Sequence, residues 1–513
     1  MSFVSQLLAT TNVDKLRALA QQKILKRALT AKDLVAIGIG TMIGGGIFTT
    51  IGTGVIGAGP AVIVSYLLAG VTSFFAALCY AELGAMVPVA GSAYTYAYAT
   101  LGKVFAWIIG FALIFEYAIS AAPVATQFSQ ALLDALHNFG LSVPDFLLMP
   151  ASGEKIHFLG PWWQLQSWDL AHSHFDVVGG LFVIALSVVL SVGIRESATT
   201  NNIFVVLKIG ALMVFIVAGA FLFDPSHFAH FAPYGLGKLT PFGGMADYSS
   251  SAQPYGIVAV GAFVFFSYIG FDTATTTAEE CKVPQRDVPL GVMGALAVGT
   301  LLYCATAIVL IGAVPWDKVP QTDPLVFALA PLHMPWVSAI ITIGVLAGTT
   351  SVALSSLLGQ ARIFYVMARD KMLPPLVAKI HPRFKTPVYT TMITGFAVAF
   401  LTLIVPLNDL LNLVNIGTLA AFTVVCGGVM YLRKKRPDLP RSFKVPFVPL
   451  FPILGIVLSL FLAVFGLSAK TWTWFAIALV CGLIFFFCYG FRKSKPEEIE
   501  PTEEPDSLAE SYV

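Results

Sequence analysis

Two hydrophobic stretches of the chain carry residues that favour a helix interrupted in mid-span. The first covers residues 36–48 and contains three consecutive glycines at 44–46, and the second covers residues 265–272 and contains Gly270. A membrane interior offers no water to unpaired amides, so a broken helix persists there only where it lines an enclosed cavity. The N–H and C=O groups freed at two such breaks are therefore candidate ligands for a solute.

The two breaks present opposite partial charges. The helix that resumes near Ile47 starts with N–H groups that lack intrahelical partners, and their partial positive charge suits a carboxylate. The helix that stops near Phe266 ends in carbonyls with a partial negative charge, which suits an ammonium group. Together they predict a zwitterionic α-amino acid as the solute. For the first break, close helix packing at Gly40 and Gly44 is the alternative.

Three ionisable residues, Glu116, Lys208 and Asp272, lie inside hydrophobic stretches. A charge within a membrane is costly, so such residues are candidates for function. Lys208 has only apolar neighbours in the chain and is a candidate for proton coupling, with an ion pair to Glu116 or Asp272 as the compatible structural alternative. Glu116 either supports Lys208 or the backbone, or contacts the solute directly. Asp272 either shares in coupling or caps the next helical segment.

The composition of the whole chain is that of a membrane protein. Of 513 residues, 57% are hydrophobic and 11% are charged, and the mean hydropathy is +0.81. Soluble domains carry about 25% charged residues, so most of this surface must face a lipid bilayer. The net charge of +2, with basic residues dispersed in short loops, argues against nucleic-acid binding.

We expect an all-α polytopic membrane protein with about twelve transmembrane helices. The predicted ranges are 33–57, 61–87, 103–131, 177–194, 200–223, 254–280, 288–314, 336–368, 388–405, 409–432, 447–468 and 471–491. Nearly all lysines and arginines between these ranges fall on one side of the membrane, and the exceptions are Lys155, Lys238, Lys318 and Lys470. By the positive-inside rule, the N- and C-termini are both cytoplasmic.

The spacing of the breaks predicts an internal repeat. They fall in the first and sixth spans, so equivalent breaks are five spans apart. Because five is an odd number, two such repeats lie in opposite orientations across the membrane. We therefore expect a 5+5 inverted repeat with discontinuous helices 1 and 6, followed by two extra helices. Repeat one covers about 33–223, repeat two about 254–432 and the extra helices about 447–491. A cytoplasmic arm at 1–32 precedes this membrane domain at 33–491, and an acidic tail at 492–513 is expected to be disordered.

Cysteines and histidines give no indication of a metal or a cofactor. The six cysteines are scattered in or beside spans without a CxxC pair, so we expect apolar packing and no disulfide. His172 and His174 fall in a predicted outside loop and are interpreted as solvated residues.

Short motifs follow one another along nearly the whole chain: GIGTMIGGGIF at 38–48, AALCYAE at 76–82, PVAGSAYTY at 88–96, FEY at 115–117, YIGFD at 268–272, PQRD at 284–287 and GQAR at 359–362. In this order they resemble the amino acid–polyamine–organocation (APC) superfamily, specifically the bacterial relatives of the cationic amino acid transporters. The resemblance implies an inverted-repeat fold with alternating access. It also implies that the amides of Gly45 and Gly46 hold the substrate carboxylate. The substrate amine would be held by nearby backbone carbonyls, which are those of Met42, Ile43, Phe266, Ser267 and Ile269.

The remaining expected site residues are Gly44, Ile47 and Phe271. The resemblance places Lys208 where sodium-coupled relatives hold a cation, which implies proton coupling. Gly45 departs from the Thr or Ser common in the family and is expected to widen the pocket. The apolar residues at the breaks favour neutral amino acids, whereas Glu116 facing the pocket would favour cationic ones.

These features predict a secondary active transporter that imports amino acids across the plasma membrane with protons. Its expected partners are the amino acid, protons and the lipid bilayer, and the sequence does not indicate an oligomeric state. An amino acid exchanger or a carrier of polyamines or cationic amino acids is the alternative. A transporter-like sensor or a polytopic membrane enzyme is less favoured, because the chain lacks long soluble extensions and an HExxH or GxSxG motif.

Overall fold

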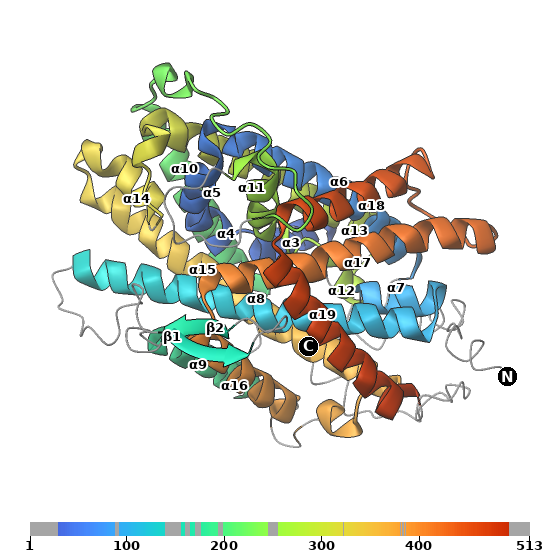
Figure 1. Ribbon diagram of the computed structural model, residues 1–513. Coiled ribbons are helices and arrows are strands. Elements are labelled where there is room, and N and C mark those ends of the chain that lie inside the picture. The colour runs from blue at the N-terminus through green and yellow to red at the C-terminus, as the bar shows by residue number, and fades with distance from the viewer. Residues whose placement is uncertain are drawn as a thin grey trace.

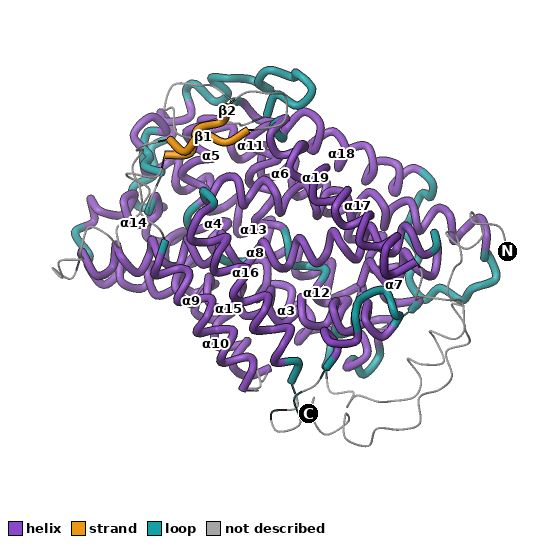
Figure 2. The backbone as a smooth tube through the Cα atoms, turned by 60° about the horizontal axis from the view of Figure 1, so that its bottom comes forward, coloured by secondary structure: helices purple, strands orange, loops and turns teal. Residues whose placement is uncertain are grey.

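The protein is built almost wholly of helices, with loops mainly at their ends (Figures 1 and 2). The computed structural model describes residues 29–87, 92–138, 155–159, 165–169, 176–192, 198–244, 255–321, 323–379, 381, 384 and 386–491. Most of the expected N-terminal arm, the acidic tail, and His172 and His174 lie outside the described residues.

Among the described residues, eight helical stretches are long and apolar enough to cross a membrane. They contain α6 (Val62–Met86), α8 (Lys103–Asn138), α10 (Ala198–Ala220), α11 (Gly256–Val264) with α12 (Thr273–Thr276), α13 (Pro284–Ala313), α15 (Pro335–Arg369), α17 (Leu407–Lys435) and α19 (Ala469–Phe485). Three shorter apolar helices are α9 (Val177–Val192), α16 (Val388–Ile404) and α18 (Leu450–Gly466). The protein is therefore a multi-pass membrane protein.

Each of the twelve predicted ranges coincides with helical structure. The number of long spans is smaller than twelve because α9, α16 and α18 are short and because the first span is divided. That span consists of α3 (Ala31–Met42), α4 (Gly45–Phe48) and α5 (Thr50–Ala58). The inverted relation between the two halves stays a prediction.

Several short elements were not predicted. They include α7 (Ser92–Thr100), α14 (Pro324–Leu329) and an antiparallel hairpin of β1 (Lys155–Leu159) and β2 (Leu165–Asp169). Each is too short to produce a clear periodic signal against the surrounding polar sequence.

Local sequence explains where several helices begin. The backbone N–H of Thr30 donates to Asp33 Oδ2 at 2.8 Å, so these residues satisfy a free donor at the start of α3. Pro284 and Pro335 occupy the first positions of α13 and α15, where the missing N–H costs nothing.

The centre of the fold is formed by α8 and α15, which pack against each other (Figure 1). α13 packs on α6 and α3, α17 packs on α8 and α18, and α9 pairs with α16. Faces turned away from these contacts carry large apolar side chains, such as Val206 (70% exposed) and Leu301 (71% exposed). Such faces fit a lipid environment.

A buried ion pair joins α6 to the last turn of α17 and to the segment that follows it. Glu82 is 2% exposed, and its carboxylate accepts from Arg433 Nε at 3.0 Å and from the backbone N–H of Val445 at 2.7 Å. Arg441 Nε lies 3.3 Å from the same carboxylate. Two cations and one amide therefore compensate the burial of this charge.

A candidate solute site between two helix breaks

The first break is a two-residue extended segment between α3 and α4. The φ/ψ angles are −79°/110° at Ile43 and −162°/−146° at Gly44. Helical structure resumes at Gly45, so Gly44 is the only one of the three glycines outside a helix. The N–H groups of Gly45 and Gly46 have no acceptor among the described residues.

The second break separates α11 from α12. A 3₁₀ turn (Phe265–Tyr268) follows α11, Ile269 is extended, and Gly270 has a φ of +114°. A side chain at Gly270 would be strained, and its Cβ would lie 2.9 Å from Thr41 Cβ. Glycine is required here by its conformation and by the closeness of the first break.

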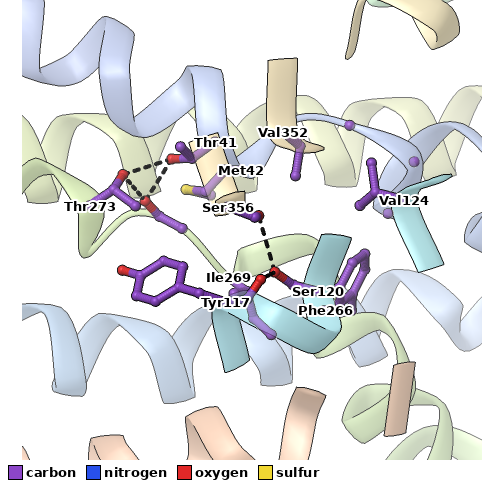
Figure 3. A pocket seen from close by; sticks show the side chains of 14 residues that line it. Thr41, Met42, Tyr117, Ser120, Val124, Phe266, Ile269, Thr273, Val352 and Ser356 are labelled. Atoms are coloured by element: carbon purple, nitrogen blue, oxygen red, sulfur yellow. Dashed lines mark hydrogen bonds between the residues drawn. The ribbon is translucent and has the colours of Figure 1, made fainter. Parts of the chain in front are cut away.

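Hydrogen bonds join the two breaks directly. Thr41 Oγ1 donates to the carbonyl of Gly270 at 2.7 Å, and Thr273 Oγ1 donates to the same carbonyl at 2.6 Å. The two hydroxyl oxygens are 2.9 Å apart. Figure 3 shows this triangle at one end of a cavity.

A cavity lies between the breaks, α8 and α15 (Figure 3). Its lining combines apolar side chains, hydroxyl groups and exposed backbone. The lining residues are Thr41, Met42, Gly44, Gly45, Gly46, Tyr117, Ser120, Val124, Phe266, Ile269, Gly270, Thr273, Val352 and Ser356. The expected site residues among them are Met42, Gly44, Gly45, Gly46, Phe266 and Ile269.

The other expected site residues lie beside the cavity rather than in its lining. Ile43 and Ile47 have fully buried side chains in the core. The carbonyl of Ser267 accepts from Tyr303 Oη at 2.7 Å. The ring of Phe271 packs against aromatic rings of α6 and α17, those of Tyr80 and Phe422.

Lys208 binds the first break from α10. Its side chain is fully buried, and Nζ donates to the carbonyls of Gly40 at 2.6 Å and Ile43 at 2.8 Å. Nζ also lies 3.3 Å from Ser351 Oγ, which itself donates to the carbonyl of Gly40 at 3.0 Å. The ammonium group thus sits at the carbonyl end of α3, where the helix dipole favours a cation.

The two intramembrane carboxyl groups are both nearly fully buried. Asp272 Oδ2 accepts from Tyr117 Oη at 3.2 Å. Asp272 occupies the N-cap position of α12 but makes no side-chain cap bond, so the interpretation of Asp272 as a helix cap is wrong. Glu116 does not line the cavity and has one carboxyl oxygen, Oε1, without a hydrogen-bond partner among the described residues.

Gly45 does not widen the cavity, contrary to the expectation from sequence. A Cβ built at this position would overlap the carboxamide of Gln127 from α8. The space that a larger residue at position 45 would need is filled by a polar side chain that sequence reasoning missed.

Sequence reasoning also missed the contributions of α8 and α15. Tyr117, Ser120 and Val124 project from one face of α8, and Ser120 Oγ lies 3.0 Å from Ser356 Oγ of α15. The positions 117, 120, 124 and 127 follow helical spacing, so a polar stripe along this hydrophobic helix was the available signal.

A polytopic helical protein with a cavity between two breaks in its hydrophobic helices has the architecture of a membrane transporter. The model of the family described as amino acid permease matches residues 29–487. The chain therefore belongs to the amino acid permease family, whose members are transporters and not enzymes.

Similar proteins occur in bacteria and plants. The methylthioribose transporter of Bacillus subtilis (strain 168) is 37% identical over 96% of this chain and 99% of its own length. The branched-chain amino acid permease BcaP of the same organism is 38% identical over 94% of this chain and 97% of its own length. The vacuolar cationic amino acid transporter 4 of Arabidopsis thaliana is 36% identical over 81% of this chain and 64% of its own length.

Proposed function

We propose that this permease imports neutral amino acids across the plasma membrane by alternating access. The import is driven by the coupled movement of protons. The observation that carries the proposal is the pair of opposed free backbone groups at the breaks. The N–H groups of Gly45 and Gly46 lack acceptors, and the carbonyls of Met42 and Ile269 lack donors among the described residues. A carboxylate at the amides and an ammonium group at the carbonyls would satisfy both sets.

The cavity supports a neutral, branched or medium-sized substrate side chain. Val124, Phe266 and Val352 supply apolar surface, while Glu116 is absent from the lining. Two of the similar proteins, from Bacillus subtilis and Lactococcus lactis, carry the name branched-chain amino acid permease. Leucine, isoleucine and valine are therefore the first substrates to test.

Lys208 is the proposed proton carrier. A charged ammonium has three donors, and the carbonyls of Gly40 and Ile43 together with the hydroxyl of Ser351 offer three oxygens within reach. A neutral amine has one donor fewer, so loss of the proton would weaken the contacts that shape the first break. If these contacts differ between the outward- and inward-facing states, the two states differ in their affinity for the Lys208 proton. Proton binding is then linked to the transport cycle.

In this proposal the two repeats, 33–223 and 254–432, move relative to each other around the cavity, and both termini are cytoplasmic. Glu116 and Asp272 are supporting groups near the cavity. Tyr117 lines the cavity and donates a hydrogen bond to Asp272. A substrate that contacts Tyr117 would therefore affect the Asp272 carboxyl through this one hydrogen bond.

The test is uptake of labelled leucine into sodium-free proteoliposomes with an imposed pH gradient. We expect accumulation by the wild type, competition by isoleucine and valine, and no accumulation by Lys208→Ala, although that variant can retain exchange. Competition by lysine alone would favour the cationic amino acid carrier. Competition by methylthioribose alone would contradict an amino acid substrate, and a strict sodium requirement would contradict proton coupling.

A further inference from the structure

Gln127 is a buried polar side chain whose carboxamide has no partner. It is 0% exposed, and neither Oε1 nor Nε2 has a hydrogen-bond partner among the described residues. Buried side-chain amides are nearly always hydrogen-bonded, because the unpaired group loses its bonds to water without replacement. A residue that departs from this rule needs an explanation beyond packing, since leucine would fill a similar volume without that cost.

The position of the carboxamide points to a ligand. Gln127 lies against Gly45, which lines the cavity, and it occupies the space of the absent Cβ. On α8 it comes three residues after Val124 and continues the face that holds Ser120 and Tyr117. The same helix face therefore carries three residues that line the cavity and one unsatisfied amide beside them.

Building on the proposed function, we propose that Gln127 is a substrate-binding residue whose Nε2 donates a hydrogen bond to the substrate carboxylate at Gly45. A carboxamide interchanges its nitrogen and oxygen by a half-turn, so the donor can face the cavity. Gly45 is then needed because any larger residue would displace this side chain. The transporter selects solutes that carry a carboxylate over solutes of the same shape that lack one.

The test compares leucine with leucinamide, which keeps the ammonium group and side chain but has no carboxylate. Binding to the purified protein in detergent is measured by displacement of labelled leucine and by direct calorimetry for each ligand. We expect Gln127→Leu to weaken leucine binding about tenfold or more, as for loss of a hydrogen bond to a charged group. Leucinamide binding should change much less.

Gln127→Glu sharpens the test because glutamate has nearly the same shape. A second carboxylate at this place repels the carboxylate of leucine and attracts a cationic ligand. We expect leucine binding to fall further than in Gln127→Leu and leucinamide binding to strengthen. This variant also serves if Gln127→Leu does not yield a monodisperse protein.

The matched control is Gln360 on α15, another buried glutamine with an unpartnered Oε1, because the atoms that fill the space at Gly45 belong to Gln127 and not to Gln360. Gln360→Leu and Gln360→Glu should leave the ratio of leucine to leucinamide affinity at its wild-type value. The proposal is overturned if the Gln127 variants keep the wild-type ratio of leucine to leucinamide affinity, because Gln127 would then only fill space. If the wild type itself binds no α-amino acid, the proposed function fails, and the carboxylate contact fails with it.

Discussion

Replacing Lys208 by methionine tests how far the first break depends on one ammonium group. Nζ donates to the carbonyls of Gly40 and Ile43, 2.6 Å and 2.8 Å away. Methionine keeps a long unbranched side chain, so the change removes the charge and the donors without opening a large cavity.

The expected magnitude follows from the carbonyls that remain. A buried carbonyl that loses its donor costs roughly 1–3 kcal/mol. Ser351 Oγ still donates to the carbonyl of Gly40 at 3.0 Å, so the full penalty falls on Ile43. Removing the buried ammonium also removes its own desolvation cost, which offsets part of the lost hydrogen bonding. We expect the free energy of unfolding to fall by about 2 kcal/mol.

The assay is equilibrium unfolding of the purified protein in detergent, with tryptophan fluorescence as the signal. Lys103→Met is the control, since Lys103 is a buried lysine at the start of α8 and makes none of the contacts to the first break described for Lys208. Lys208→Met should be less stable than the wild type and should bind leucine more weakly. A variant with wild-type stability and wild-type leucine affinity would refute the argument that this ammonium holds the break in shape.

Three further perturbations test other parts of the structure. Gly46→Ala should weaken leucine binding more than Gly44→Ala. The new methyl group at position 46 would lie 2.8 Å from the backbone Cα of Ser267 in the second break, whereas the one at position 44 would lie 2.7 Å from a side-chain methyl group of Val352, which can move. Equal leucine affinities of the two variants would contradict this argument. Burial and a neighbouring carboxyl raise the pKa of Asp323 to about 7 from 3.8, so stability present at low pH is lost as the pH rises through 7. Asp323→Asn should flatten the fall in melting temperature between about pH 4 and 7, and an unchanged profile would exclude this group as its source. Glu82→Gln should lower the free energy of unfolding by roughly 3 kcal/mol in a denaturant titration, since two arginines lose their counter-charge.

The positions of the breaks were predictable because backbone chemistry leaves a composition signal. Three glycines in a row indicated the first break, although the unwound part is only Ile43 and Gly44. The first N–H groups of a helix have no intrahelical acceptor in any case, so Gly45 and Gly46 can be helical and still present free amides. The sequence therefore indicated the free groups correctly while overestimating the length of unwinding.

The cavity walls were harder to predict because their residues are ordinary members of hydrophobic helices. Tyr117 and Ser120 fall on α8, and Val352 and Ser356 fall on α15, more than 200 residues further along the chain. Nothing in the local sequence specifies which helices pack together across such separations. Gln127 was likewise missed, and its presence reversed the interpretation of Gly45 as a source of free space.

The two breaks act as one hydrogen-bonded unit, and this gives the proposed coupling a physical route. The ammonium of Lys208 holds the carbonyl of Gly40, and the next residue, Thr41, donates to the carbonyl of Gly270. That carbonyl also accepts from Thr273 at the start of α12, so the end of α3 cannot shift without disturbing the second break. In the proposed mechanism, loss of the Lys208 proton would weaken the contact to Gly40, and a substrate between the breaks would touch Gly270 and Thr273, which line the cavity. Under this proposal, proton and substrate would act on the same short segment of backbone, as linkage between two sites requires.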